Sequence, residues 1–350
     1  MKTFKNLYPQ IYALENLYLA ARKARKRKTR KKYVEDFELH RERFLRKIQE
    51  ELADETYMPS GYRQFYIYDP KKRLISAAPY RDRIVHHALC NVIQPLIERR
   101  FIYDTYSCRV GKGTLAAQER CRKYTNRFKY ALKCDIKKYF QSIDHQILLE
   151  KIAGVIACRK TLELCRKIIN SCCDETEPHE LFDGDDLVSV TDRKKGLPIG
   201  NLTSQMWANL YLDSMDHLIK EVLRVPAYAR YTDDFVLWSD DRKFLRESRD
   251  RIAGFLCRGR LKLHEGKTRI MACGCGVPFL GFRFYPELSP RLDGEAKRRF
   301  EIRTRKQVVD YKLGLSTVEE IKLSVFGWIQ HARYGNVNGL LIKYRNEKFG

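Results

Sequence analysis

Apolar residues recur every three or four positions at both ends of the chain and in several segments between them. Near the N-terminus they predict helices around residues 14–19 and 37–48, on either side of a basic stretch. Residues 81–99 show the same spacing, and we expect that helix to end at Pro95, because proline lacks the amide hydrogen that a helix interior uses. Further helices are predicted at 206–223, at 241–264 and through most of 291–350.

Short apolar or alternating runs predict strands between the helices. Residues 62–76 alternate as a hairpin with Asp69-Pro70-Lys71 at its turn, and residues 129–135 form a strand that ends in Asp135 and leads into a helix. A second hairpin is expected at 227–241, and a strand or hairpin at 277–287. The polar residues 171–195 lack apolar periodicity and are interpreted as an excursion between elements. Strands and helices in this order indicate an α+β fold, a sheet domain flanked by helical pieces.

Charge is the unusual feature of the composition. The 350 residues include 68 Lys and Arg against 44 Asp and Glu, a formal net charge of +24, while the hydrophobic content of 44% is typical of a globular protein. Such a surplus favours a polyanionic partner, and nucleic acid is the commonest one. The nearly all-basic stretch 22–32 is either a solvated helical face or a phosphate-contacting arm, and the charge of the whole chain favours the arm.

Several other classes of protein and site are disfavoured by the same sequence. No apolar run reaches the length of a membrane span and the N-terminus lacks the apolar core of a signal peptide, so we expect no membrane contact and a cytoplasmic location. The 11 cysteines are interpreted as reduced thiols, and no ligand spacing supports a zinc site. The acidic residues at 183–186 lack the spacing of a calcium-binding loop.

Two adjacent carboxylates, Asp233 and Asp234, interrupt the apolar run of the second hairpin. A tight turn there directs both side chains out of the core, where they repel each other unless one takes a proton or a cation neutralises both. Asp135 also ends an apolar strand, so the three acids predict a site for two Mg²⁺ ions about 3.5 to 4 Å apart, an arrangement that serves phosphoryl transfer. The alternative is an ordinary exposed turn, which the flanking apolar segments disfavour.

These acids lie in segments that resemble the motifs of a known family. The run 230–238, RYTDDFVLW, is similar to the Tyr-x-Asp-Asp motif of reverse transcriptases, and LKCDIKKYFQSID at 132–144 is similar to their first catalytic aspartate block. Segments similar to the fingers blocks, to the lysine block (LKLHEGKTRI) and to the primer-contacting hairpin (VPFLGFRFYPE) occur in the family's order. The resemblance therefore covers residues 63–287.

The resemblance implies a role for each matching residue. The metal site would consist of Asp135, Ile136, Asp233 and Asp234, with one Mg²⁺ activating the primer 3′-hydroxyl, the other holding the incoming triphosphate, and Mn²⁺ as a substitute. Phe140 would be the aromatic gate that excludes a 2′-hydroxyl, although an ordinary core aromatic is the alternative. Nucleotide contacts are implied for Lys71, Arg73, Phe140, Ile199, Gly200 and Lys267, and primer or template contacts for Tyr231, Thr232 and Gly281.

One block departs from the commonest family pattern. Most reverse transcriptases have Pro-Gln-Gly followed by Ser-Pro, whereas this chain has Pro198-Ile199-Gly200 and Ser204-Gln205. The variant resembles the reverse transcriptases of diversity-generating retroelements, which implies error-prone copying of template adenines, mutagenic retrohoming of the cDNA and a small basic accessory variability protein, itself an oligomer. Ile199 would provide bulk but no hydrogen bond against the new base pair, which predicts looser base selection.

Together these expectations describe a right-hand polymerase with three parts. They are a basic N-terminal helical arm (1–50), fingers and palm with an antiparallel sheet (51–285), and a helical thumb (286–350) whose basic residues follow the duplex backbone. The expected partners are template RNA, a primer and their RNA–DNA hybrid, in a bacterial, archaeal or phage setting. Two alternatives stay open: a reverse transcriptase of the group II intron, retron or abortive-infection type, and a non-catalytic RNA-binding scaffold.

Overall fold

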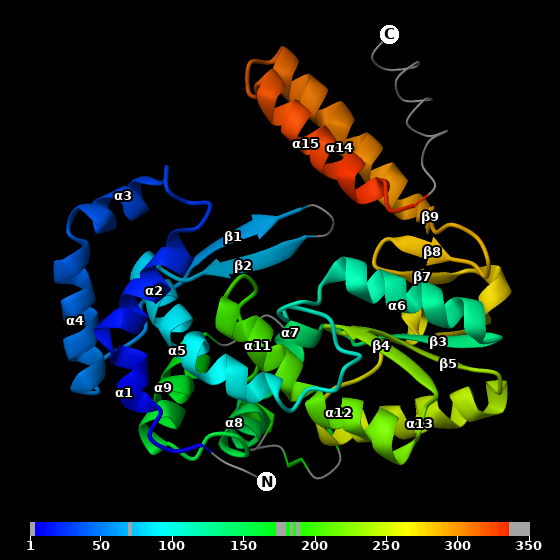
Figure 1. Cartoon of the computed structure of the whole chain (residues 1–350), viewed down its shortest axis with the longest axis horizontal. Helices are drawn as coiled ribbons and strands as arrows, with labels where there is room; N and C mark the ends of the chain where they lie inside the picture. Colours follow the sequence, from blue (N-terminus) through cyan, green and yellow to red (C-terminus); the bar gives the residue numbers. More distant parts are fainter. Residues whose placement is uncertain (1–3, 69–71, 173–179, 183–184, 187–189, 336–350) are drawn as a thin grey trace.

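A four-stranded antiparallel sheet forms the centre of the molecule (Figure 1). In this computed structural model, residues 4–68, 72–172, 180–182, 185–186 and 190–335 are described. The sheet order is β4-β5-β3-β6, formed by β3 (Tyr130–Asp135), β4 (Ala227–Tyr231), β5 (Asp234–Ser239) and β6 (Arg269–Ala272). The strand expected at 129–135 and the hairpin expected at 227–241 are thereby confirmed.

Alternate residues of the central strands face two separate cores. Leu132 and Leu237 pack in the larger core, to which α13 (Arg242–Arg258) contributes. Ala131 and Trp238 point to the other face and pack in a second core under α6 (Thr114–Arg127). Because both faces are covered, the strands read as nearly continuous apolar runs, and the polar strand ends mark the exposed edge of the sheet.

A layer of helices, most of them from the N-terminal part of the chain, lies beside the central sheet (Figure 1). Helix α2 packs along α5, and both share the larger core with the sheet. The layer comprises α1 (Tyr8–Tyr12), α2 (Leu14–Arg25), α3 (Lys32–Leu39), α4 (Arg41–Ala53), α5 (Tyr80–Glu98), α8 (His145–Ala153) and α9 (Arg159–Asn170). The expected end of a helix at Pro95 is wrong, because α5 continues to Glu98. Ile93 and Ile97 on either side of Pro95 are fully buried, so packing outweighs the hydrogen bond that proline removes.

The single helix expected at 206–223 is divided. It consists of α11 (Leu202–Tyr211), α12 (Asp213–His217) and a π-helical turn at Leu218–Val222. The segment buries Asp213 and Asp216, whose charges a periodic apolar pattern does not take into account. Asp216 pairs with Arg230 of β4, so tertiary contacts shape this segment more than its apolar spacing does.

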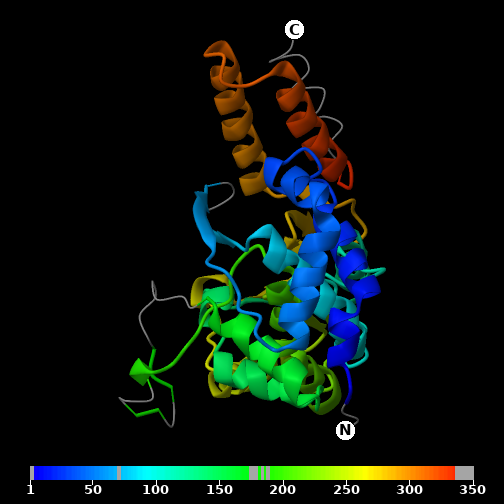
Figure 2. The ribbon, with the colours of Figure 1, turned by 90° about the vertical axis from the view of Figure 1, so that its left-hand side faces the viewer.

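Two projections extend from this body. The hairpin of β1 (Arg63–Ile67) and β2 (Arg73–Ala77) confirms the first expected hairpin, although its predicted turn at 69–71 lies outside the described residues. At the other end, β7 (Val277–Phe279), β8 (Phe282–Phe284) and β9 (Arg291–Leu292) form a small sheet that leads into α14 (Gly294–Lys312) and α15 (Val318–Ala332). These two helices lie side by side and project away from the body (Figures 1 and 2).

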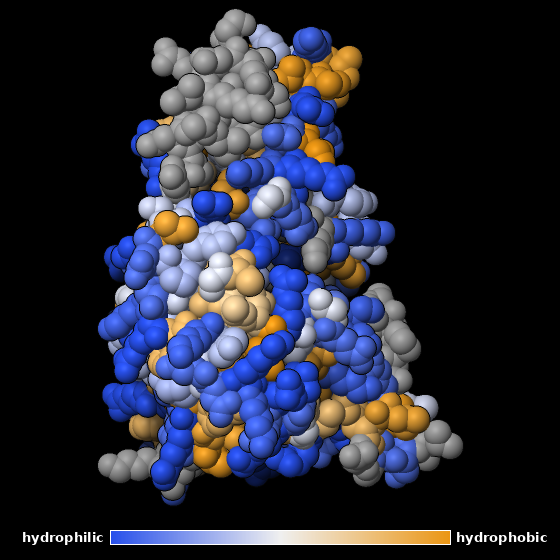
Figure 3. Space-filling model, turned by 90° about the vertical axis from the view of Figure 1, so that its right-hand side faces the viewer, coloured by the Kyte–Doolittle hydropathy of each residue, from blue (hydrophilic) through white to orange (hydrophobic). Residues whose placement is uncertain are grey.

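The stacked rings of Phe300 and Trp328, with centroids 3.7 Å apart, join α14 to α15. A capping box at Thr317 and Glu320 begins α15. Hydrophilic residues predominate on the face of the molecule shown in Figure 3, with small apolar islands between them. None of the described helices combines the length and the apolar content that crossing a membrane would require.

Candidate active site

Strand pairing brings the three predicted aspartates to one edge of the sheet. Asp135, the last residue of β3, lies opposite Asp234, the first residue of β5. Tyr231 of β4 also pairs with Asp234, so only Thr232 and Asp233 remain in the turn of the β4–β5 hairpin. Antiparallel neighbours that lie opposite each other have Cβ atoms about 4.5–5.5 Å apart, so the fold places the carboxylates of Asp135 and Asp234 within reach of a shared cation.

The turn that carries Asp233 has an unusual backbone. Thr232 has a φ of 60°, whereas Asp233 is not among the residues with positive φ. A positive φ at the first central residue alone fits a type II′ turn, where glycine is the usual residue and a β-branched side chain is strained. Two hydrogen bonds hold Thr232 there: its hydroxyl donates to Ser107 Oγ at 2.7 Å, and its carbonyl accepts from Arg230 at 3.0 Å.

Arg230 connects this turn to the interior. Its Nε and Nη2 donate to the two carboxylate oxygens of Asp216 at 2.8 and 2.5 Å, and both side chains are completely buried. Its Nη1 also donates to Asn209 Oδ1 at 3.2 Å, and Asn209 in turn donates to the Ser107 carbonyl at 2.8 Å. The network thus encloses the turn, since both Ser107 and Arg230 contact Thr232.

The sequence interpretation missed this network. A signal was present, because an arginine in the middle of an apolar strand must find a partner when the strand is buried. The partner itself was not recognisable, since Asp216 lies in a segment that was interpreted by its apolar spacing.

Two lysines neutralise the carboxylates. Lys133 Nζ pairs with Asp234, and Lys267 Nζ pairs with Asp135. Burial lowers the pKa of Lys133 to about 8, against the effect of nearby groups that favour its charged form. Burial also raises the pKa of Asp233, and the charge of Asp135 adds to that effect. The lysine at 267 was predicted to contact phosphates, whereas Lys133 was missed, although its i, i+2 spacing from Asp135 places both on one strand face.

The donor chemistry of this edge fits divalent metal ions. Within the described residues, no three His, Cys, Asp or Glu side chains are grouped as metal ligands in the present conformation. The carboxylates nevertheless already hold cations, since two ammonium groups lie on Asp135 and Asp234. Carboxylate oxygens are the ligands that Mg²⁺ prefers, so bound Mg²⁺ would be held by Asp135, Asp233 and Asp234 and would displace the two lysines.

The segment 196–200, which contains the predicted nucleotide contacts Ile199 and Gly200, packs between α7 (Tyr139–Ser142) and the β1–β2 hairpin. The Phe140 carbonyl accepts a hydrogen bond from Leu197 N at 2.8 Å. Gly200 has a φ of 115°, and a Cβ there would lie 3.3 Å from the side chain of Ile75. A glycine at this position therefore allows the segment to approach β2 closely, as only glycine adopts this conformation without strain.

The other predicted contact residues are distributed around this edge. Arg73 is exposed at the start of β2, while Lys71 lies outside the described residues. The hydroxyl of Tyr231 accepts from Thr114 Oγ1 at 3.4 Å. Gly281, in the β7–β8 turn, has a φ of 85° and faces His331 of α15. The nucleotide, primer and template roles of these residues stay predictions.

Three comparisons place this geometry among known proteins. The sequence profile described as "Reverse transcriptase (RNA-dependent DNA polymerase)" matches residues 68–284. Protein YkfC from Escherichia coli (strain K12) is 24% identical over 279 residues, which cover 68% of this chain and 70% of YkfC. The group II intron-encoded protein LtrA from Lactococcus lactis subsp. cremoris is 24% identical over 182 residues, 51% of this chain but only 28% of LtrA.

A solved structure shows the same fold. Apo telomerase from Candida tropicalis superimposes with a TM-score of 0.50 at 13% identity, covering 77% of this chain and 56% of that chain. The right-hand α+β fold expected from the sequence is thereby confirmed. The profile match spans well over half of the residues and includes Asp135, Asp233 and Asp234. The chain belongs to the reverse transcriptase family of RNA-dependent DNA polymerases.

Proposed function

We propose that the chain copies a template RNA by adding deoxynucleotides to a primer 3′-end. The observation that carries this proposal is the antiparallel register that sets Asp135 opposite Asp234, with Asp233 in the adjoining two-residue turn. Two Mg²⁺ ions held there would activate the attacking hydroxyl and stabilise the leaving pyrophosphate. Mn²⁺ would serve in their place.

The residues of this chain orient the reactants. The Arg230 network keeps the turn in the conformation that presents Asp233. Lys267, once displaced from Asp135, is placed to pair with phosphate oxygens, and Arg73 is exposed for the same purpose. Phe140 lies beside the buried Tyr139 and would close the sugar pocket against a 2′-hydroxyl.

Within the family, we assign the chain to the reverse transcriptases of diversity-generating retroelements. This assignment is supported by Ile199 and by Ser204-Gln205, which replace the residues that most of the family carries. Gln205 is exposed and accepts from Cys108 Sγ at 3.2 Å, and Cys108 follows the Ser107 that holds Thr232. The segment that differs from the commonest family pattern therefore contacts the loop of Ser107 and Cys108, which supports the turn that carries Asp233. The expected consequences are mutagenic copying of adenines, an oligomeric basic accessory protein as partner, and a cytoplasmic site of action.

A second candidate is a reverse transcriptase of the group II intron type. The similarity to LtrA favours it, although this chain spans less than a third of that protein. Sequencing of the cDNA made from a defined RNA, with and without a candidate accessory protein, separates the two. Errors concentrated at template adenines support the retroelement assignment, and errors spread evenly over the four bases contradict it.

Primer extension on an RNA template with Mg²⁺ tests the polymerase itself. Asp233→Asn should lower the rate by about 10³-fold or more, the range for removal of a catalytic group. Asp250→Asn is the matched control, because Asp250 is exposed on α13, where it pairs with its neighbour Arg249. RNA binding with no extension by the unaltered chain on any template, with or without a partner, would instead indicate a non-catalytic scaffold.

A further inference from the structure

A second group of charged side chains lies next to the strand end that carries Asp135. It lines a cavity of about 110 Å³. Six of the lining residues are basic: Lys137, Lys138, Arg193, Lys195, Arg260 and Lys262. Glu180 is the one acidic residue among the described lining residues. The described lining residues thus carry six basic groups against one carboxylate.

Backbone contacts join this basic cavity to the catalytic strand. Lys137 N donates to the carbonyl of Lys262 at 2.9 Å, and His264 N donates to the carbonyl of Asp135 at 2.8 Å. Between them, Ile136 and Leu263 form an antiparallel bridge. The cavity therefore begins two residues beyond Asp135 and is held in register with it.

Glu180 occupies the basic cavity in a defined way. Its carboxylate accepts from Lys137 Nζ at 2.7 Å and from Lys262 Nζ at 2.8 Å. Its backbone carbonyl accepts from Arg193 at 3.0 Å. The centre of the Phe182 ring lies within 6 Å of the charged groups of both Arg193 and Lys262, and these contacts help to hold Glu180 and Phe182 in place. The hydrogen bonds from Lys137 and Lys262 lower the pKa of Glu180 to about 2.

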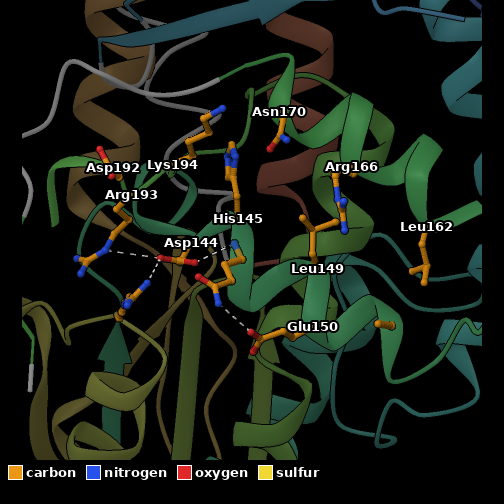
Figure 4. Close-up of a pocket in the computed structure, with 13 residues that line it drawn as sticks. Asp144, His145, Leu149, Glu150, Leu162, Arg166, Asn170, Asp192, Arg193 and Lys194 are labelled. Carbon is orange, nitrogen blue, oxygen red and sulfur yellow. Dashed lines mark hydrogen bonds and ion pairs between the residues drawn. The ribbon is translucent and has the colours of Figure 1, made fainter. Parts of the chain in front are cut away.

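The wall of arginines behind the carboxylate is anchored separately. Asp144 accepts from Arg260 at 2.6 Å and lies 3.7 Å from Arg193, the contact drawn in Figure 4. Asp185 pairs with the same two arginines. Because these side chains are held in place before any ligand arrives, the cavity is preorganised for an anion.

We propose that this cavity binds a polyphosphate group, and that Glu180 occupies the position of one phosphate until the ligand displaces it. The ligand class is the triphosphate tail of a nucleotide or the pyrophosphate that synthesis releases, so the inference rests on the proposed polymerase function. Phosphate oxygens accept charge-assisted hydrogen bonds from lysine and arginine as a carboxylate does, and a polyphosphate carries more negative charge than Glu180. A cationic cavity beside the site also raises the local concentration of such anions.

The dimensions favour a polyphosphate over a nucleic acid strand. A volume of about 110 Å³ accommodates a compact anion, whereas an RNA strand needs a continuous groove along its backbone. Phe182, the aromatic residue among the described lining residues, already has two cationic groups within 6 Å of the centre of its ring, and these compete with a base for stacking.

Calorimetric titration of the full chain with inorganic pyrophosphate, without divalent metal, tests the proposal. Under these conditions no metal ion can join the ligand to the aspartates, so binding reports on cationic side chains. Glu180→Gln should tighten binding about fivefold or more because it removes the competing carboxylate. Lys262→Gln should weaken binding about tenfold, the equivalent of one charge-assisted hydrogen bond.

The exposed pair Lys243 and Glu247 on α13 provides matched controls, Lys243→Gln and Glu247→Gln, which should change binding less than twofold. Titration with a deoxynucleoside triphosphate distinguishes the two sources: an equal response to Glu180→Gln indicates the incoming tail, and a response to pyrophosphate alone indicates the product. Either result supports the site.

Equal pyrophosphate affinity in the unaltered chain, Glu180→Gln and Lys262→Gln would overturn the proposal, as would a response confined to single-stranded RNA. Because the titration requires no synthesis, it is repeated in an Asp233→Asn chain. Retained pyrophosphate binding there, without extension, separates failure of this site from failure of the polymerase.

Discussion

Arg230 shows how one buried side chain supports the shape of the turn that carries Asp233. Its guanidinium neutralises Asp216 and at the same time donates to the carbonyl of Thr232, whose φ is positive. A strained turn persists only when its surroundings hold it in place. Arg230 therefore has two separable effects, one on stability and one on the position of Asp233.

Substitution of the pair separates the two effects. Arg230→Met should lower the free energy of unfolding by about 3–5 kcal/mol, because Asp216 is left buried without its cationic partner, although the hydroxyl of Tyr228 still donates to it at 2.7 Å. Arg230→Met with Asp216→Leu should recover most of that loss, yet primer extension should stay at least about tenfold below normal because the Thr232 carbonyl has lost its donor. Denaturant unfolding and extension rates measure both. Full recovery of the rate in the double variant would show that Arg230 is purely structural.

Ile199 is the residue on which template fidelity is expected to depend. Ile199→Gln restores a polar group against the new base pair and should lower misincorporation at adenines about tenfold, the effect of roughly 1.4 kcal/mol. Deep sequencing of cDNA from a defined template measures it, with Val222→Gln, at an exposed position beyond α12, as the control. Unchanged error rates in Ile199→Gln would contradict this role.

At the scale of elements, α5 is the buried helix that follows the β1–β2 hairpin and packs against α2 and α11. It begins three residues after β2 ends and is buried along most of its length. Its His86 is 2% exposed, and its Nε2 has no hydrogen-bond partner among the described residues. Burial lowers the pKa of His86 to about 4, although the charge of Asp82 opposes this effect.

This buried histidine predicts acid sensitivity. The unfolded chain binds a proton at His86 near pH 6.5 but the folded chain only near pH 4, so stability falls as the pH is lowered between these values, by at most about 3 kcal/mol. His86→Met should abolish this part of the loss, and the exposed His40→Gln should not. Thermal unfolding from pH 7 to pH 4 measures the difference. Parallel pH profiles for His86→Met and the unaltered chain would exclude His86 as the cause.

At the scale of the molecule, the β1–β2 hairpin and the α14–α15 pair rise from the same body (Figures 1 and 2). Exposed basic residues on α14, including Arg298, Arg305 and Lys306, suit the predicted contact with duplex phosphates. With a net charge of +24, binding to any nucleic acid will be salt-dependent, so the slope of that dependence is more informative than one affinity.

The slope identifies the residues that contact the duplex. Changing Arg298, Arg305 and Lys306 together to Gln should reduce the slope of log K against log salt by about two to three for an RNA–DNA hybrid, since each lost phosphate contact removes about 0.9. The control changes Arg242, Lys243 and Arg246, three exposed basic residues on α13, and should leave the slope nearly unchanged. Equal effects of the two triple variants would mean that α14 makes no particular contact with the duplex.

The local pattern of apolar and polar residues was sufficient to predict many of the strands and helices of this protein. Alternating and continuous apolar runs predicted the strands, and acids at their ends predicted an edge site, because these features depend on neighbours within a few residues. The divided helix at 202–222 and the passage of α5 through Pro95 were not predictable, since buried Asp216 and the burial of Ile93 and Ile97 decide them. The roles of Lys133, Ser107 and Lys262 were hidden for the same reason, since their partners are distant in the chain.

The sequence by itself determined the family, the strands whose ends carry the three aspartates and the basic character of the chain, because motif order, strand periodicity and net charge are properties of residues in line. Only the tertiary structure decided which lysine neutralises which carboxylate, how Arg230 supports a turn that threonine would not adopt alone, and that Glu180 fills a cationic cavity beside Asp135. The physical reason is that charge pairing and strain depend on distances in space, which chain folding sets and residue order does not reveal.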